Sequence, residues 1–114
     1  MKYMMLIYAT EAERQQSYAE NGPARATKLC HELSAEGKYL GASPLQPVAS
    51  AISVRVRDGK QLVTDGPFAE TREQIGGFWL IDVKNLDAAI AIAARIPSGP
   101  TGVVEIRPLV EALG

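Results

Sequence analysis

Hydrophobic side chains fill nearly every position of two segments, which is the pattern of strands that are covered on both faces. These segments are residues 2–9 and 77–83. Two further strand candidates, residues 39–45 and 103–107, mix apolar and polar side chains more evenly. The pattern therefore predicts four strands of one sheet, with residues 2–9 and 77–83 in its middle.

A strict alternation marks the centre of the chain. Residues 51–57 place an isoleucine and two valines on one side, and a serine and two arginines on the other. This period of two is typical of a half-buried strand. Asp58-Gly59 is a strong signal for a two-residue hairpin turn, so we expect the chain to return along residues 60–64.

Three segments carry the patterns of helices. Residues 11–20 are polar, and Thr10 before them is a suitable N-cap. Residues 24–36 carry an apolar stripe at positions i, i+3, i+4 and i+7. A third helix is expected from Asn85, another suitable N-cap, to Ile96, just before a proline.

Without the hairpin, the order of these elements is βαββαβ, which is the order of a ferredoxin-like fold. We therefore expect a single α+β domain over residues 1–114 with an inserted β-hairpin. Two helices cover only one face of such a sheet, so the other face would expose an apolar patch of several hundred Å². This predicts a homodimer in which the open sheet faces pack together. The alternative is a monomer whose hairpin folds over this face.

Composition and charge narrow the class of protein. The 114 residues include 12 basic and 13 acidic side chains, for a formal net charge of −1. This balance argues against a nucleic-acid partner and against a polybasic surface that binds membranes. No apolar run approaches the roughly 20 residues of a transmembrane helix, and the first residues lack a signal-peptide cleavage site. We expect a cytoplasmic protein.

The chain has one cysteine, Cys30, and one histidine, His31. A lone cysteine excludes an intramolecular disulfide and a multi-cysteine zinc site, so we expect neither a metal nor a cofactor. Cys30 lies on the apolar stripe and is most simply a buried small hydrophobic residue. His31 can transfer protons near neutral pH and is a second catalytic candidate. The alternative for His31 is a helix residue without function.

Residues 63–83 closely resemble the signature of the YCII-related proteins, in the branch named after its DGPF motif. The motif stands here as Asp65-Gly66-Pro67-Phe68 and continues as Ala-Glu-Thr. Other similar segments are residues 1–4, 54–59, 93–97 and 104–108. The resemblance implies a dimeric α+β barrel of ferredoxin-like subunits. It also implies a small enzyme, because a His–Asp pair lines a cleft in some members, or a regulatory context beside extracytoplasmic-function sigma factors.

One position departs from the members that carry the His–Asp pair. Their histidine aligns near Ala26, so only the aspartate of the pair, Asp65, carries over to this chain. Asp65 is the candidate general base. The alternative is that its carboxylate serves only its own backbone, as an Asx-turn.

Three further residues are candidates for binding a substrate: Phe68, Arg72 and Arg55. Phe68 lies in the same turn as Asp65. Arg72, between Glu70 and Glu73, could clamp a carboxylate or phosphate, and Arg55 could attract an anion. The alternatives are a solvated polar segment and a charged edge strand.

These features predict a small-molecule-binding protein or a cofactor-free acid/base enzyme. Its cleft would lie near the DGPF loop and take a small anionic or carbonyl ligand. An enzyme would have Asp65 facing a pocket of about 300 Å³ or more. The competing hypothesis is a non-catalytic regulatory or interaction protein, associated with an extracytoplasmic-function sigma factor.

Overall fold

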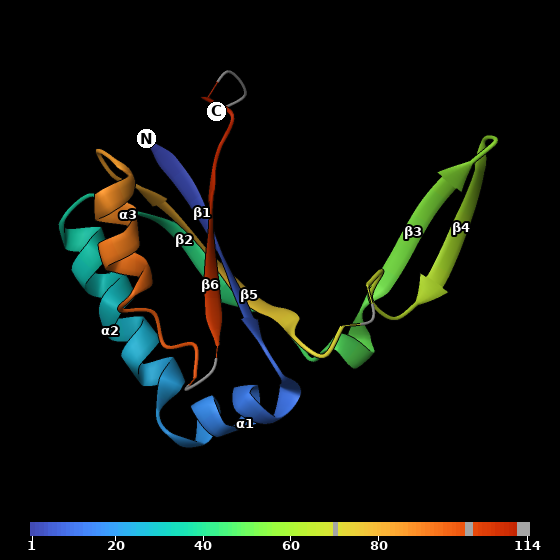
Figure 1. Cartoon of the computed structure of the whole chain (residues 1–114), viewed down its shortest axis with the longest axis horizontal. Helices are drawn as coiled ribbons and strands as arrows, with labels where there is room; N and C mark the ends of the chain where they lie inside the picture. The colour runs from blue at the N-terminus through green and yellow to red at the C-terminus, as the bar shows by residue number, and fades with distance from the viewer. Residues whose placement is uncertain (70, 100–101, 112–114) are drawn as a thin grey trace.

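A computed structural model describes residues 1–69, 71–99 and 102–111 of the chain. Within these residues, six strands and three α-helices follow one another (Figure 1). In order, the elements are β1 (Lys2–Ala9), α1 (Glu11–Ala19), α2 (Gly22–Ala35), β2 (Tyr39–Pro44), the 3₁₀ turn η1 (Val48–Ser50), β3 (Ile52–Arg57), β4 (Lys60–Asp65), β5 (Gln74–Asp82), α3 (Leu86–Ala93) and β6 (Val103–Pro108).

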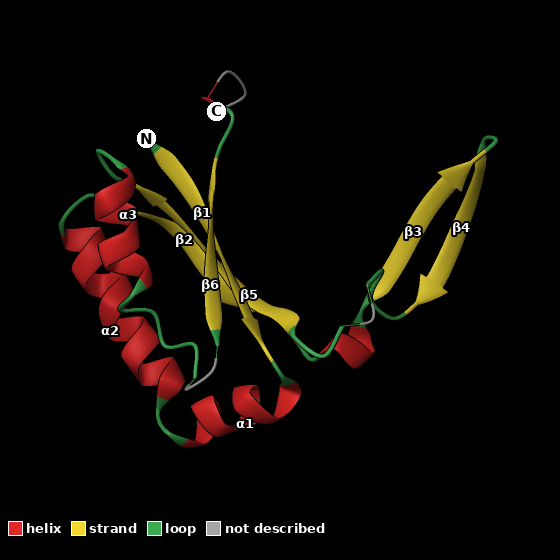
Figure 2. Cartoon of the chain, in the orientation of Figure 1, coloured by secondary structure: helices red, strands yellow, loops and turns green. Residues whose placement is uncertain are grey.

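Four strands form one antiparallel sheet in the order β2-β5-β1-β6. The two central strands, β1 and β5, are the two segments whose side chains are apolar at almost every position. Helices α2 and α3 lie side by side on one face of this sheet, and α1 lies across its lower end in Figure 2. The architecture is α+β and compatible with a ferredoxin-like fold, as the order of elements predicts.

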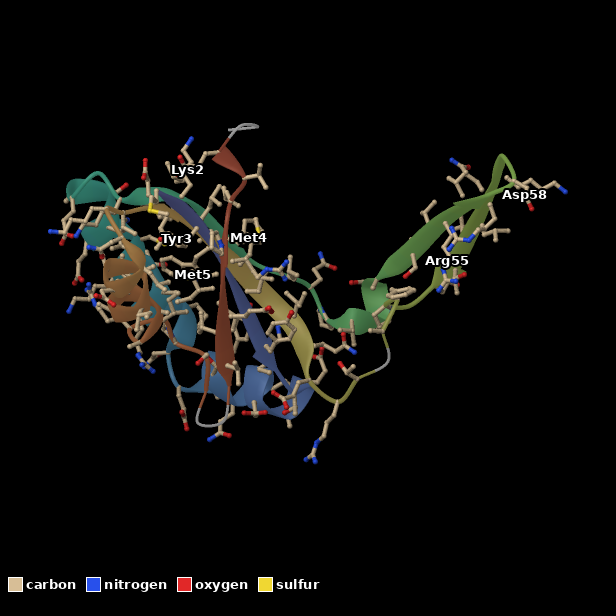
Figure 3. All side chains as sticks on the ribbon, turned by 45° about the horizontal axis from the view of Figure 1, so that its top comes forward. Lys2, Tyr3, Met4, Met5, Arg55 and Asp58 are labelled. Carbon is tan, nitrogen blue, oxygen red and sulfur yellow. The ribbon has the colours of Figure 1, made fainter. Side chains whose placement is uncertain are left out.

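The core lies between the sheet and helices α2 and α3. Alternate side chains of β1 and β5 point to the helices, so Tyr3 and Met5 are buried while Met4 points to the other side (Figure 3). Leu33 of α2 has no exposed surface. The remaining buried apolar residues are Leu29, Trp79, Ile81, Val83, Ala89, Ile92 and Ile96.

No helix of the described part of the chain covers the other face of the sheet. We call this the open face and define it by Met4, Leu6, Phe78 and Leu80, which are half-buried. The register joins Met4 to Leu80 and Leu6 to Phe78 across the two central strands, so the four side chains are neighbours. Pairing of two chains through this face stays a prediction.

Strands β3 and β4 form a separate two-stranded sheet, here called the arm (Ile52–Asp65). Asp58 and Gly59 both have positive φ, 50° and 76°, so the predicted two-residue hairpin turn is confirmed. The arm stands apart from the main sheet in Figure 1. The prediction that the first arm strand is half-buried is wrong, because five of its six residues are exposed. A period of two identifies a strand but not what covers it.

Two boundaries differ from the sequence prediction. Strand β5 begins at Gln74, before the Gly76-Gly77 pair. Helix α3 ends at Ala93, not at Ile96. The amides of Arg95 and Ile96 donate to carbonyls three residues earlier, so the last turn tightens before the proline.

Candidate functional site

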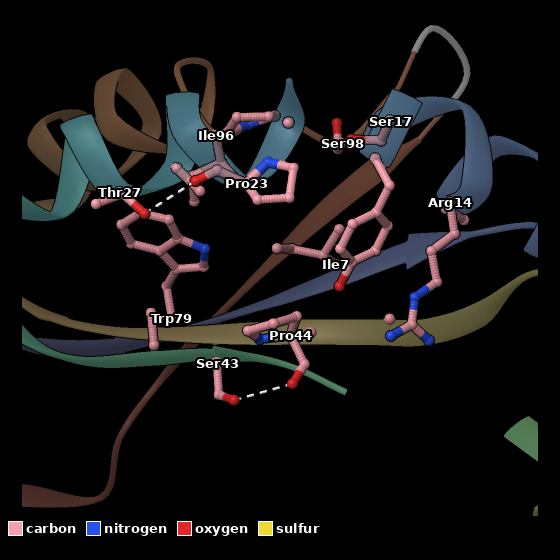
Figure 4. Close-up of a pocket in the computed structure, with 18 of the residues that line it drawn as sticks. Ile7, Arg14, Ser17, Pro23, Thr27, Ser43, Pro44, Trp79, Ile96 and Ser98 are labelled. Atoms are coloured by element: carbon pink, nitrogen blue, oxygen red, sulfur yellow. Dashed lines mark hydrogen bonds between the residues drawn. The ribbon is translucent and has the colours of Figure 1, made fainter. Parts of the chain in front are cut away.

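A cleft of about 320 Å³ opens where α1 and the first half of α2 meet the end of the sheet (Figure 4). Strands β1, β2 and β5 form its floor, and the loop that follows α3 closes one side. The lining combines segments from the beginning, middle and end of the chain. In this article "the cleft" means this site.

Most of the lining is apolar. Trp79 lies against α2 at one end, and Ile7 lies on the floor near the middle. The ring of Tyr39 stacks edge-on against Trp79, with 6.4 Å between centroids and 84° between planes, which fixes the indole in place. The other apolar lining residues include Ala26, Cys30, Ala42, Pro44, Ile96 and Pro97.

Of the described residues that line the cleft, Arg14 alone carries a charged side chain. It extends from α1 toward the strands at the end opposite Trp79 (Figure 4). Its guanidinium carbon lies 5.9 Å from the ring centroid of Tyr18, a cation–π distance. Within the described residues it makes no ion pair. The cleft therefore has one cationic end in largely apolar surroundings.

Two hydroxyl groups of the lining serve the backbone beside them. Thr27 Oγ1 donates to the Pro23 carbonyl, and Ser43 Oγ donates to the Pro44 carbonyl, both at 2.9 Å (Figure 4). Each hydroxyl oxygen retains lone pairs that can accept a further hydrogen bond. The cleft thus offers acceptors from its walls as well as the Arg14 donors.

Local sequence positions the two helices of the cleft. Thr10 and Glu13 form a capping box, in which each side chain accepts from the other residue's amide at 3.2 Å. Asn21 turns the chain between α1 and α2 with φ of 63°. Gly22 is buried against Ser17, where a Cβ atom would collide with the Ser17 backbone and side chain. Any larger residue there would push the two helices apart.

A tyrosine and a cysteine meet beneath this region. Burial raises the pKa of Tyr39, and the adjacent Cys30 adds to the shift, while a hydrogen bond with the Ala42 backbone opposes it. Tyr39 therefore keeps its proton at physiological pH. Cys30 is partly buried, packs against the core as expected of a small apolar residue, and also lines the cleft.

The structure places Asp65 away from the cleft. Asp65 is the last residue of β4, opposite Ile52, and not part of a loop as predicted. Its side chain is exposed and does not line the cleft. The hydrogen bonds at this corner come from neighbours, since the Gly66 amide donates to Ala51 and Ser53 Oγ donates to the Gly66 carbonyl. A catalytic role for Asp65 stays a prediction.

Two of the predicted binding residues lie together, Arg55 on the arm and Phe68 just after it. The guanidinium carbon of Arg55 lies 4.9 Å from the ring centroid of Phe68, whose side chain is 76% exposed. Arg72 is exposed and, like these two, does not line the cleft. Glu70 lies outside the described residues. The structure brings Arg55 and Phe68 together, but it does not bring them to the cleft of the same chain.

His31 is exposed on α2 and does not line the cleft, and a catalytic role for it stays a prediction. Ala26, where the resemblance would align a histidine, does line it. Sequence reasoning missed Arg14 and Tyr18, because the polar segment that carries them was interpreted only as a helix. Their spacing of four residues, which stacks an arginine on an aromatic ring, was the available signal.

In residues 1–69, 71–99 and 102–111, no three His, Cys, Asp or Glu side chains cluster closely enough to hold a metal ion. None of the helices in this part of the chain has the length and apolar character that crossing a bilayer requires.

Comparison with known proteins identifies the family. The profile of the YCII-related domain matches residues 1–112. The chain belongs to the YCII-related family. A relative from Rhizobium meliloti (strain 1021), named as an uncharacterised protein, is 37% identical over 118 aligned positions that cover 96% of this chain and 92% of the relative. Membership of the DGPF branch stays a prediction.

Proposed function

We propose that this YCII-related protein binds a small molecule with an apolar body and an anionic group in the cleft. The observation that carries the proposal is Arg14, which makes no ion pair within the described residues and points into a largely apolar cavity. A guanidinium in such surroundings forms charge-assisted, often bidentate, hydrogen bonds with a carboxylate or phosphate.

The size and lining of the cleft favour a small ligand. A volume of about 320 Å³ lies at the lower end of the range for small-molecule sites. The Trp79 indole at the far end from Arg14 supplies a flat apolar surface for an aromatic or aliphatic body. A small aromatic or branched carboxylate would contact both ends at once.

Binding is better supported than acid/base catalysis. Among the described residues, those that line the cleft include no carboxylate and no imidazole, and these are the usual proton-transfer groups. Catalysis by Asp65 would require its carboxylate to reach a bound ligand from the arm. An association with a sigma factor rests on the family resemblance.

We further propose that two chains pair through their open faces. Met4, Leu6, Phe78 and Leu80 form a continuous apolar surface without a helix over it. Burial of such a surface stabilises a dimer by about 25 cal/mol per Å² before the costs of association.

The binding proposal is tested with a panel of small carboxylates, such as benzoate, phenylacetate and 4-methylpentanoate, and with their uncharged amides. Binding is followed by thermal shift and by the fluorescence of Trp79, the only tryptophan. A charge-assisted hydrogen bond contributes about 1.5–3 kcal/mol, so Arg14→Gln should weaken carboxylate binding roughly tenfold to a hundredfold.

The matched control is Arg25→Gln, an exposed arginine of α2 that does not line the cleft. It removes the same charge and should leave the dissociation constant within about threefold of that of the wild type. Such a change in binding free energy is smaller than the contribution of one ordinary hydrogen bond. The proposal is wrong if no carboxylate changes either signal, or if both variants bind as the wild type does.

A further inference from the structure

The arm has one face of β-branched apolar side chains that nothing in the described chain covers. The ladder places Val54 opposite Val63, with Ile52 and Val56 on either side along β3. Their exposed fractions are 58% and 63% for Val54 and Val63, and 64% and 61% for Ile52 and Val56. The two strands pack chiefly on each other.

The opposite face of the arm carries Arg55, Arg57 and Lys60, with Ser53, Thr64 and one exposed apolar side chain, Leu62, between them. Charged side chains on a free strand prevent unwanted pairing, so this face suits water. An isolated two-stranded hairpin is marginally stable and needs a packed face. The apolar face also holds Gln61 and Asp65 at its two ends, opposite Val56 and Ile52, but it exposes more apolar surface than the basic face and is the better suited to a contact.

We propose that the apolar face of the arm (Ile52, Val54, Val56 and Val63) docks on a second copy of this chain. The inference rests on the proposed homodimer and extends it. In Figures 1 and 3 the arm stands away from its own sheet, on the side that carries no helices. A second copy on the open face would therefore lie within reach of the arm.

The areas favour a second copy as the occupant. Four side chains of this size and exposure offer roughly 400 Å², about the largest apolar patch of a typical monomer. A stable interface buries about 800 Å² on each partner. The open face and the arm together supply an area of this order, whereas the half-buried open face alone falls short of it. In a two-fold dimer each chain would give one arm and receive one.

The test compares two double variants by sedimentation velocity over a micromolar concentration series. Val54→Lys with Val63→Glu places a charged pair on the apolar face. Because the two residues face each other across the ladder, their ion pair supports the hairpin. Ser53→Lys with Thr64→Glu makes the same change at the neighbouring pair on the polar face. The control also loses the Ser53 hydrogen bond to Gly66, so it disturbs the arm itself more.

We expect the apolar-face variant to weaken dimerisation about tenfold or more, and the polar-face variant to stay within about threefold of wild type. Equal dimerisation of the apolar-face variant and wild type would overturn the role of the arm. Native Trp79 fluorescence of each variant shows that the main domain is folded.

Leu6→Glu on the open face separates the two proposals. A dimer that Leu6→Glu breaks and the arm variant does not would leave the open-face dimer standing and overturn the arm. A dimer that the arm variant breaks and Leu6→Glu does not would support the arm and overturn the open face. A wild type that stays monomeric over the series would overturn both.

Discussion

Gly77 is a residue of β5 that lines the cleft. Replacing it with alanine tests how tightly the strands that form the floor of the cleft pack together. An added Cβ atom would lie 3.0 Å from the Ser43 carbonyl oxygen and 3.3 Å from the Pro44 Cα atom. Both are backbone atoms of the neighbouring strand, so they cannot rotate away. Either β2 shifts outward by a few tenths of an ångström or the contact stays strained.

The cost follows from two opposing effects. Overpacking of this kind destabilises proteins by about 1–3 kcal/mol. Replacing a glycine also lowers the conformational entropy of the unfolded chain, which stabilises the folded protein by about 0.4–1 kcal/mol. We therefore expect Gly77→Ala to lower the free energy of unfolding by about 1–2 kcal/mol.

The adjacent glycine gives a matched control. A Cβ atom on Gly76 would lie 3.9 Å from Arg14 Cδ and 4.0 Å from the Ile7 carbonyl oxygen, which are ordinary contacts. Gly76→Ala should keep its stability or gain up to about 1 kcal/mol. Urea unfolding followed by Trp79 fluorescence measures both variants. The packing argument is refuted if Gly77→Ala is as stable as wild type, or if the two variants lose the same amount.

Three further predictions concern a helix cap, the core and a surface ion pair. Thr10→Ala removes the cap of α1 and should cost about 1 kcal/mol. Since α1 has no buried residues, the loss should appear as faster hydrogen exchange within α1, and unchanged exchange there would contradict it. Leu33→Ala should cost about 2–5 kcal/mol in urea unfolding because Leu33 is fully buried. Leu86→Ala, at a half-exposed position, should cost less, and equal losses would contradict the assigned core. The hydrogen bond and charge of Lys38, 2.7 Å from the carboxylate, lower the pKa of Glu36. The small contribution of this ion pair to stability is thus fully present above the ordinary pKa of a glutamate. It is lost as the pH falls through the lowered pKa of Glu36 in the folded protein. An NMR titration should show the pKa of Glu36 rising in Lys38→Met, and an unchanged value would refute this cause.

The sheet was predictable from the sequence because its signal is local. Two-sided apolar runs identified β1 and β5 as central strands, and Thr10 and Asn85 were recognised as helix caps. The sequence did not predict which face of the sheet the helices cover, since β1 carries large apolar side chains on both faces. Only packing against α2 and α3 selects the face of Tyr3 and Met5.

The candidate site was less predictable because it is not local. The cleft joins Arg14, Trp79 and the loop around Pro97, which no single motif spans. The DGPF motif identified the family, but the position of Asp65 depends on the direction in which the arm leaves the sheet. The pattern of β3 predicted a strand correctly, and only the three-dimensional arrangement shows that its apolar side is uncovered.

An NMR titration of the ¹⁵N-labelled chain with the tightest carboxylate of the panel tests the ligand site most directly. The lone indole N–H of Trp79 and the amide of Arg14 lie at opposite ends of the cleft. We predict that both signals shift and saturate together, while the chemical shifts of the Asp65 and Phe68 amides do not change. Shifts centred on Asp65 and Phe68, with Trp79 and Arg14 unmoved, would contradict the assignment of the cleft as the binding site.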